Sequence, residues 1–277
     1  MAKHDEGFFS ARDGLRLFWQ SNLPDAPRAH IGIVHGYADH SERYRKTIDT
    51  WVAEGFAVHA FDYRGHGRSD GRRGYCATFG EYVDDLGLFW NRVRAAAGGK
   101  PAFLLGHSHG ALMSLHFLAR KPADLAGVVL SAPYLKLALK PPAVKLFASK
   151  LIAHVIPWLP VKNELTPADL TRDPAHQRAT AADPLYNKVV TPRWFTESTR
   201  AQDEARTMGG QVRLPVLIVA GSADGVASTP VTRDFFATVG SADKKYVEYP
   251  GMLHECLNEV GHEQVWKDIS GWILAHL

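Results

Sequence analysis

A chain of 277 residues with 45% hydrophobic and 22% charged residues has the composition of a soluble globular protein, and its length suits one large α/β domain with an insertion. A net charge of +3, without any dense run of lysine and arginine, excludes nucleic-acid binding from the functions that we expect. Two cysteines are too few for a disulfide framework, and we find neither a signal peptide nor the run of roughly 18 apolar residues that a membrane span requires, so we expect a soluble cytoplasmic protein.

Short apolar runs typical of β-strands recur along most of the chain. The first is a hairpin over residues 8–19, FFSARDGLRLFW, with its turn at Asp13-Gly14. The later runs are mostly continuously apolar rather than alternating, which is typical of parallel strands covered by helices on both faces. They occupy residues 30–36, 56–62, 102–108, 127–133, 215–221 and 245–251.

Segments with helical spacing of apolar residues separate these strands. One of them begins near Phe79 and ends at Gly98. Another is capped by Ser228 or Thr229, with Pro230 in its first turn. This alternation of strands and helices predicts an α/β fold with a doubly wound, mostly parallel sheet.

One stretch, from about residue 134 to about residue 208, interrupts the alternation, because it contains many prolines and no convincing strand. An apolar stripe with helical spacing runs from Val144 to Ile156 and includes Leu151 and Val155. The stripe either packs on the core or, as part of a helical cap, forms apolar walls of a binding site. We therefore divide the chain into an α/β core and a helical cap insertion, namely residues 1–133 with 209–277, and residues 134–208.

The pentapeptide GHSHG, centred on Ser108, lies between an apolar strand and a helical segment. Strand, tight turn and helix form the context in which Gly-x-Ser-x-Gly presents a nucleophile. Side chains in place of Gly106 and Gly110 would collide with the turn, so the glycines fit this interpretation. Metal ligation by His107 and His109 is disfavoured, because both rings would have to point one way from a sharp turn without a carboxylate or cysteine beside them. We interpret Ser108 as a nucleophile.

A serine nucleophile needs a base to take its proton and a carboxylate to orient that base. When such a triad is built on a doubly wound sheet, the carboxylate and then the histidine follow the serine along the chain. Asp224 and His254 follow in this order, each just beyond a strand, where such sheets bind ligands. Asp224 could instead shape a turn, and His254 could be a surface histidine among 14. Asp62 also follows a strand but precedes the serine, so we assign its loop a structural role.

Two backbone amides are candidates for an oxyanion hole. One belongs to His109, the residue after the nucleophile, and the other to Tyr37, in the loop after an early strand. Gly36, just before Tyr37, would allow a close approach of the backbone. His109 would then contribute its amide, and its side chain need not be a ligand.

The motifs HGYADHSERY, FDYRGHGRSDGRRG, GHSHGA, GSADGV and YPGMLHE together resemble the monoacylglycerol lipase and lysophospholipase family of α/β hydrolases. The resemblance extends over nearly the whole chain and is weakest in the insertion. It implies hydrolysis of single-chain lipids beneath a helical cap, without a cofactor or a metal. By position it also assigns the triad and the oxyanion donors, namely Ser108, Asp224, His254, Tyr37 and His109. The chain departs from the family where Asp39 replaces the usual glutamate and where His109 replaces a residue that is commonly methionine.

On these grounds we expect a serine ester hydrolase that cleaves monoacylglycerols through an acyl-enzyme. The same residues would serve a lysophospholipase, a short-chain esterase, a thioesterase or an acyltransferase. A catalytically silent ligand-binding scaffold is the alternative from a different class. A monoacyl lipid is the expected partner, with transient contact to a membrane or micelle surface through the cap, and the oligomeric state is left open.

Five residues are predicted to bind the substrate. Asp39 and Arg43 lie just after the oxyanion loop and are candidates to contact the glycerol hydroxyls. The alternative for these two is a surface ion pair, which would contribute about 0–1 kcal/mol. His107, Leu151 and Val155 are expected to line the rest of the substrate site.

Overall fold

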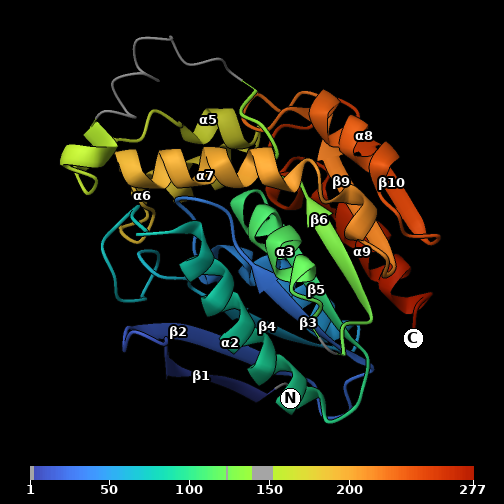
Figure 1. Ribbon diagram of the computed structural model, residues 1–277. Helices are drawn as coiled ribbons and strands as arrows, with labels where there is room; N and C mark the ends of the chain where they lie inside the picture. Colours follow the sequence, from blue (N-terminus) through green and yellow to red (C-terminus); the bar gives the residue numbers. More distant parts are fainter. Residues whose placement is uncertain (1–2, 123, 139–151) are drawn as a thin grey trace.

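The computed structural model describes residues 3–122, 124–138 and 152–277 and places an eight-stranded sheet at the centre of the molecule (Figure 1). The strand order is β1-β2-β4-β3-β5-β6-β9-β10; the pairs from β4 to β10 are parallel, and β2 is antiparallel to both of its neighbours. The predicted doubly wound, mostly parallel sheet is therefore confirmed. The strands are β1 Lys3–Ser10, β2 Arg16–Leu23, β3 Ala29–Val34, β4 Phe56–Phe61, β5 Ala102–His107, β6 Gly127–Ser131, β9 Val216–Gly221 and β10 Lys244–Tyr249.

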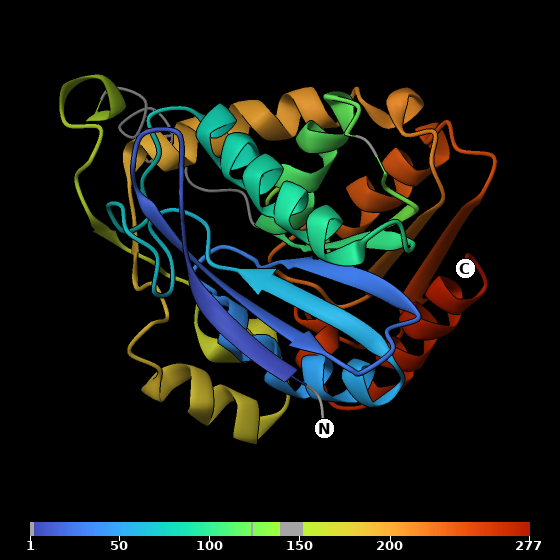
Figure 2. The same cartoon turned by 90° about the horizontal axis from the view of Figure 1, so that it is seen from below.

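Helices cover both faces of the sheet, as Figure 2 shows. Helices α1 and α9 pack on one face, and α2, α3 and α8 pack on the other. Successive side chains of a strand point to opposite faces, so Phe103 and Leu105 join the first layer while Leu104 joins the second. The core helices are α1 Arg45–Ala53, α2 Phe79–Ala97, α3 His109–Ala119, α8 Thr229–Thr238 and α9 His262–Leu274, with short 3-10 turns at Ser41–Tyr44, Gly209–Gln211 and Cys256–Asn258.

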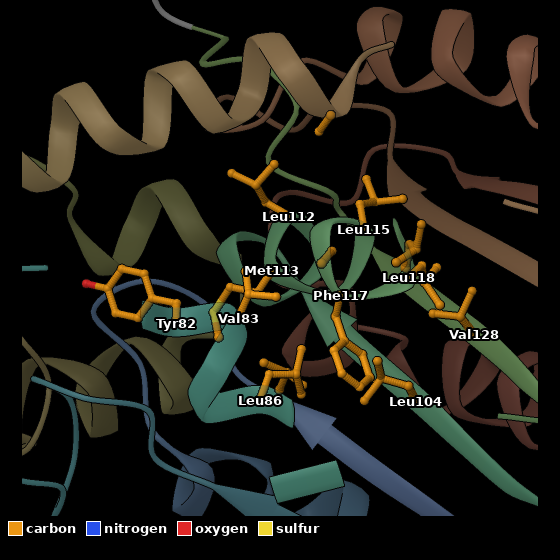
Figure 3. Packing of buried hydrophobic residues seen from close by; sticks show 14 of the residues in the cluster. Tyr82, Val83, Leu86, Leu104, Leu112, Met113, Leu115, Phe117, Leu118 and Val128 are labelled. Carbon is orange, nitrogen blue, oxygen red and sulfur yellow. The ribbon is translucent and has the colours of Figure 1, made fainter. Parts of the chain in front are cut away.

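The packing of α2 and α3 on the sheet holds the start of α3 in place. Figure 3 shows Phe117 of α3 between Leu86 of α2 and Leu104 of β5, and Leu118 of α3 beside Val128 of β6. All of these side chains are buried, as are Ala111 and Leu112 in the first turn of α3, so the helix is packed closely on the sheet along its length.

Local signals in the sequence account for the ends of several helices and strands. The first hairpin turns at Asp13-Gly14 as predicted, and Gly14 has a φ of 87°. Helix α2 ends at Gly98, which adopts the left-handed conformation with a φ of 56°. Ser228 is the N-cap residue of α8, with Pro230 in the first turn.

The insertion between β6 and β9 contains helices, but it also contains a strand pair that was not predicted. Two-residue strands pair in antiparallel fashion, so the expectation of no strand in this segment was wrong. The pair is short enough that no periodicity marks it. Besides helical residues 152–155, the described elements of the insertion are β7 Val161–Lys162, α5 Pro167–Leu170, α6 Pro174–Ala182, β8 Val189–Val190 and α7 Pro192–Ala205.

Most of the predicted apolar stripe, including Leu151, lies outside the described residues. Of its remaining members, Ile152 is partly buried, Val155 is 69% exposed and Ile156 is exposed. In the parts of the chain that the structure describes, no helix has the length and hydropathy needed to cross a bilayer.

Candidate active site

Ser108 stands on a tight turn between β5 and α3. It is not a glycine, yet its φ is 54°, and this strained conformation is the one expected for a nucleophile presented on such a turn. A Cβ atom on Gly106 would lie 2.6 Å from the carbonyl oxygen of Gly110, and one on Gly110 would collide with the carbonyl oxygen of Val34. The flanking glycines are therefore a steric requirement of the turn.

The side chains of Ser108, His254 and Asp224 form a hydrogen-bonded row. His254 Nε2 lies 2.8 Å from Ser108 Oγ, and His254 Nδ1 lies 2.8 Å from Asp224 Oδ2. The other carboxylate oxygen of Asp224 accepts hydrogen bonds from the amides of Val226 and Ala227 at 2.8 and 2.9 Å. These amides fix the carboxylate, which in turn fixes the ring of His254.

The amides of Tyr37 and His109 are the predicted donors of the oxyanion hole. His109 is the first residue of α3, where a helix has amides without intrahelical partners. Neither amide donates a hydrogen bond to an acceptor within the described ranges. A Cβ on Gly36 would lie 3.3 Å from the Cβ of Ser108, so the loop that carries Tyr37 passes close to the nucleophile. An oxyanion hole needs donors of this kind, and the role of these two amides stays a prediction.

The side chains of His107 and His109 have different surroundings. His107 Nδ1 lies 3.2 Å from Ser131 Oγ, and its ring centre lies 5.1 Å from that of His254. His109 Nε2 lies 3.3 Å from Ser198 Oγ of α7. Burial lowers the pKa of His107 to about 4 and the pKa of His109 to about 3, so both rings are neutral at pH 7. His107 lies against the triad, whereas His109 lies under the insertion.

Asp39 and Arg43 belong to a buried ion network beside His254. Both side chains are almost fully buried, so the alternative of a surface ion pair is wrong. Arg43 Nη1 donates to Asp39 Oδ1 at 2.9 Å, and its two terminal nitrogens donate to both carboxylate oxygens of Glu255 at 3.1 and 3.0 Å. Arg43 Nη2 also donates to Thr180 Oγ1 of α6 at 2.8 Å. Contact of Asp39 and Arg43 with a glycerol head group stays a prediction.

Glu255 was missed in the sequence, although it directly follows His254. Its carboxylate also lies 2.9 Å from His176 Nε2, and its amide donates to the carbonyl oxygen of Leu170 at 2.8 Å. Burial by itself would raise the pKa of Glu255, but the adjacent charge of Arg43 holds this pKa well below its ordinary value. Glu255 is therefore a buried anion that joins the loop of His254 to the insertion.

Comparison with known proteins identifies the family. The model of the family described as serine aminopeptidase, S33, matches residues 25–261. The chain belongs to this family. It is 31% identical to a monoacylglycerol lipase of Mycolicibacterium smegmatis over 98% of each chain, and 31% identical to a phospholipase of Bacillus subtilis over 88% of this chain and 94% of the other. The solved structure of a monoacylglycerol lipase from Paleococcus ferrophilus has a TM-score of 0.82 and 26% identity, with all of both chains covered.

These similarities confirm the resemblance predicted from the motifs. The chain is a serine hydrolase of the α/β-hydrolase type, in the group of lipases and esterases to which its relatives belong. Ser108 and His254 both lie within the matched range, as does Asp224.

The pKa of His254 predicts the acid limb of this hydrolase's pH profile. Burial would lower that pKa, but the charges of Asp224, Glu255 and Asp39 and the hydrogen bond that His254 donates to Asp224 together raise it above its ordinary value of 6.5. Only the neutral ring can accept the proton of Ser108. We therefore expect kcat/KM to fall about tenfold per pH unit below an apparent pKa higher than 6.5.

The measurement is the initial rate on p-nitrophenyl butyrate at the isosbestic wavelength of p-nitrophenol between pH 4.5 and 9. Circular dichroism over the same range serves as the control for folding. An acid limb centred below pH 6, in protein that stays folded, would show that the carboxylates do not raise the pKa of His254.

Proposed function

We propose that this hydrolase cleaves monoacylglycerols, or closely related monoacyl lipids, through an acyl-enzyme. The observation that carries the proposal is the row from Ser108 through His254 to Asp224, with 2.8 Å at each contact, beside the amides of Tyr37 and His109, which bond to no acceptor in the described parts of the chain. The similarity to a monoacylglycerol lipase over 98% of both chains supports the choice of substrate.

In the proposed mechanism, Ser108 Oγ attacks the acyl carbonyl carbon while His254 Nε2 takes its proton. The amides of Tyr37 and His109 stabilise the tetrahedral oxyanion. Collapse of this intermediate expels the glycerol, which receives the proton from His254. A water molecule, activated in the same way by His254, then hydrolyses the acyl-enzyme and releases the fatty acid.

A panel of esters tests the choice of substrate class. The panel contains 1-monoacylglycerols, lysophospholipids and p-nitrophenyl esters that share the same acyl chains. We expect the highest kcat/KM on the monoacylglycerols. A preference for lysophospholipids would reassign the head group, and activity confined to short p-nitrophenyl esters would make the protein a general carboxylesterase.

We also propose that the insertion, residues 134–208, caps the site and touches the lipid surface from which the substrate comes. Among the described residues, five of the eight exposed large hydrophobic side chains lie close together in sequence. Concentration of exposed apolar area in one segment is typical of a contact surface, and tryptophan is favoured where apolar and aqueous phases meet. The five are Val155, Ile156, Trp158, Leu159 and Val161.

Replacement of Val155 by aspartate tests this surface. The variant should bind less to phosphatidylcholine vesicles and lose more activity on 1-oleoylglycerol than on p-nitrophenyl butyrate, because a longer acyl chain buries more apolar area at about 25 cal/mol per Å². The matched control is Val260→Asp, since Val260 is 56% exposed and lies outside the segment. Equal losses on both substrates, together with a lower Tm, would instead make Val155 part of the packing.

A further inference from the structure

The loop that carries the amide of Tyr37 is bound to one stretch of the insertion, residues 183–194. The amide of Asn187 donates to the carbonyl oxygen of Ala38 at 2.8 Å, and His40 Nε2 lies 2.7 Å from Asp183 Oδ2. The hydroxyl of Tyr37 donates to the carbonyl oxygen of Val189 at 2.5 Å. These three hydrogen-bonding contacts join the loop to the same stretch of the insertion.

The side chain of Tyr37 is held from several directions. Its ring centre lies 3.8 Å from that of Trp194 of α7 and 5.2 Å from that of His66, which it meets edge-on. Gly74 makes room for the hydroxyl, because a Cβ there would lie 2.5 Å from Tyr37 Oη and 2.7 Å from the carbonyl oxygen of Val189. Burial raises the pKa of Tyr37 well above its usual range, so the hydroxyl keeps its proton and remains a donor.

The backbone between these contacts is strained. Ala38 has a φ of 67°, in the left-handed region that residues with a side chain rarely adopt. A conformation of this kind persists only where the surrounding structure over-determines it. The amide of Asn187 bonds the carbonyl group of Ala38 itself, and Tyr37 and His40 anchor the loop on either side. The insertion thus supplies the contacts that keep the loop in its strained form.

We propose that Tyr37 is a positioning residue. Contacts of its side chain with residues 183–194 of the insertion hold the Tyr37 amide where it can donate to the oxyanion. This inference rests on the proposed function, because it concerns the oxyanion hole of that same reaction. Its consequence is that the insertion contributes to kcat even for esters too short to touch it. A segment that only covered the substrate would affect binding of long acyl chains and leave the turnover of a butyrate unchanged.

The experiment replaces Tyr37 by phenylalanine, which keeps the ring on Trp194 and removes only the hydroxyl. Loss of a whole oxyanion donor costs about 10²–10³ in kcat, so loosening one should lower kcat on p-nitrophenyl butyrate roughly tenfold, with KM within about twofold. The second readout is inhibition by 1,1,1-trifluorohexan-2-one. Ser108 Oγ adds to its carbonyl carbon, passes its proton to His254 and leaves the negative charge on the former ketone oxygen. The Ki of this ketone should rise by a similar factor.

Two further variants complete the test. Tyr82→Phe removes another phenol of the same buried aromatic cluster, whose hydroxyl donates to the carbonyl oxygen of Tyr75 at 3.3 Å, and it should leave kcat and Ki unchanged. Asp183→Asn weakens the contact with His40 while keeping the side-chain oxygen that accepts from the amide of Leu185. Asp183→Asn should lower kcat about threefold, and it replaces Tyr37→Phe as the test variant if Tyr37→Phe does not fold.

The outcomes separate this inference from the proposed function. Turnover retained by Ser108→Ala would overturn both proposals together. If Ser108→Ala is inactive but Tyr37→Phe and Asp183→Asn keep the wild-type kcat and Ki, only the positioning role is overturned. A fall in kcat and a rise in Ki for Tyr37→Phe, absent in Tyr82→Phe, would support it.

Discussion

Replacing Ser108 with alanine is expected to lower kcat for ester hydrolysis by roughly a million-fold, to the level that the oxyanion donors and substrate binding provide alone. His254→Ala should lose about as much. Because Ser108 Oγ and His254 Nε2 lie 2.8 Å apart and act in one proton transfer, the two losses should not multiply in the double variant.

The measurement is kcat on 1-oleoylglycerol and on p-nitrophenyl butyrate, together with covalent labelling by a fluorophosphonate. The wild-type protein should be labelled at Ser108, and Ser108→Ala should not be labelled. Ser270→Ala is the matched control, since its hydroxyl donates to the carbonyl oxygen of Lys267 at 3.4 Å and, among the described residues, bonds nowhere outside α9. Full turnover by Ser108→Ala would remove the triad assignment, and a silent but folded wild-type protein would favour a ligand-binding scaffold.

Replacing Arg43 with methionine is expected to destabilise the fold by about 3–5 kcal/mol, because it leaves buried carboxylates without their partner. Asp39 and Glu255 both keep lowered pKa values through the charge of Arg43, even though burial by itself would raise them. Without the guanidinium, both carboxylates would have to bind protons or draw in water.

Urea unfolding at pH 7 measures this change in stability. Arg45→Met is the matched control, since Arg45 is 54% exposed and its contact with Asp49 is a surface pair at 3.8 Å, for which about 0–1 kcal/mol is expected. Activity then separates two roles. A structural Arg43 should affect a monoacylglycerol and the p-nitrophenyl ester of the same acyl chain in parallel, whereas a glycerol contact would raise KM for the monoacylglycerol alone.

The parallel strands, the tight turn at Ser108 and the three residues of the row could be predicted because each is marked by its immediate neighbours. Continuous apolar runs define buried parallel strands, and the spacing of Gly106, Ser108 and Gly110 reflects local steric clashes. Asp224 and His254 follow strands of that same sheet. In each case the physical cause and the sequence signal lie within a few residues of each other.

The ion network could not be predicted, because its cause lies far away in sequence. Arg43 stands in the polar stretch HSERY, which is typical of an exposed turn, and its main partner Glu255 is 212 residues away. The same holds for the hydroxyl of Tyr37, whose acceptor on Val189 is 152 residues away. Tertiary packing decides whether such groups are buried, and no local sequence pattern predicts it.

The pairing of β6 with β9 has a consequence for engineering. The insertion leaves the sheet after β6 and returns to it at β9, and these strands are hydrogen-bonded neighbours, with Ser131 opposite Val219. Because the two strands are parallel, the chain leaves at the carboxyl end of β6 and re-enters at the amino end of β9, one strand over in the sheet. A chimera could therefore exchange the whole segment for that of a relative without altering the order of strands. Such a graft should work best when the relative's counterpart of residues 37–40 is transferred together with its insertion, since these two segments contact each other.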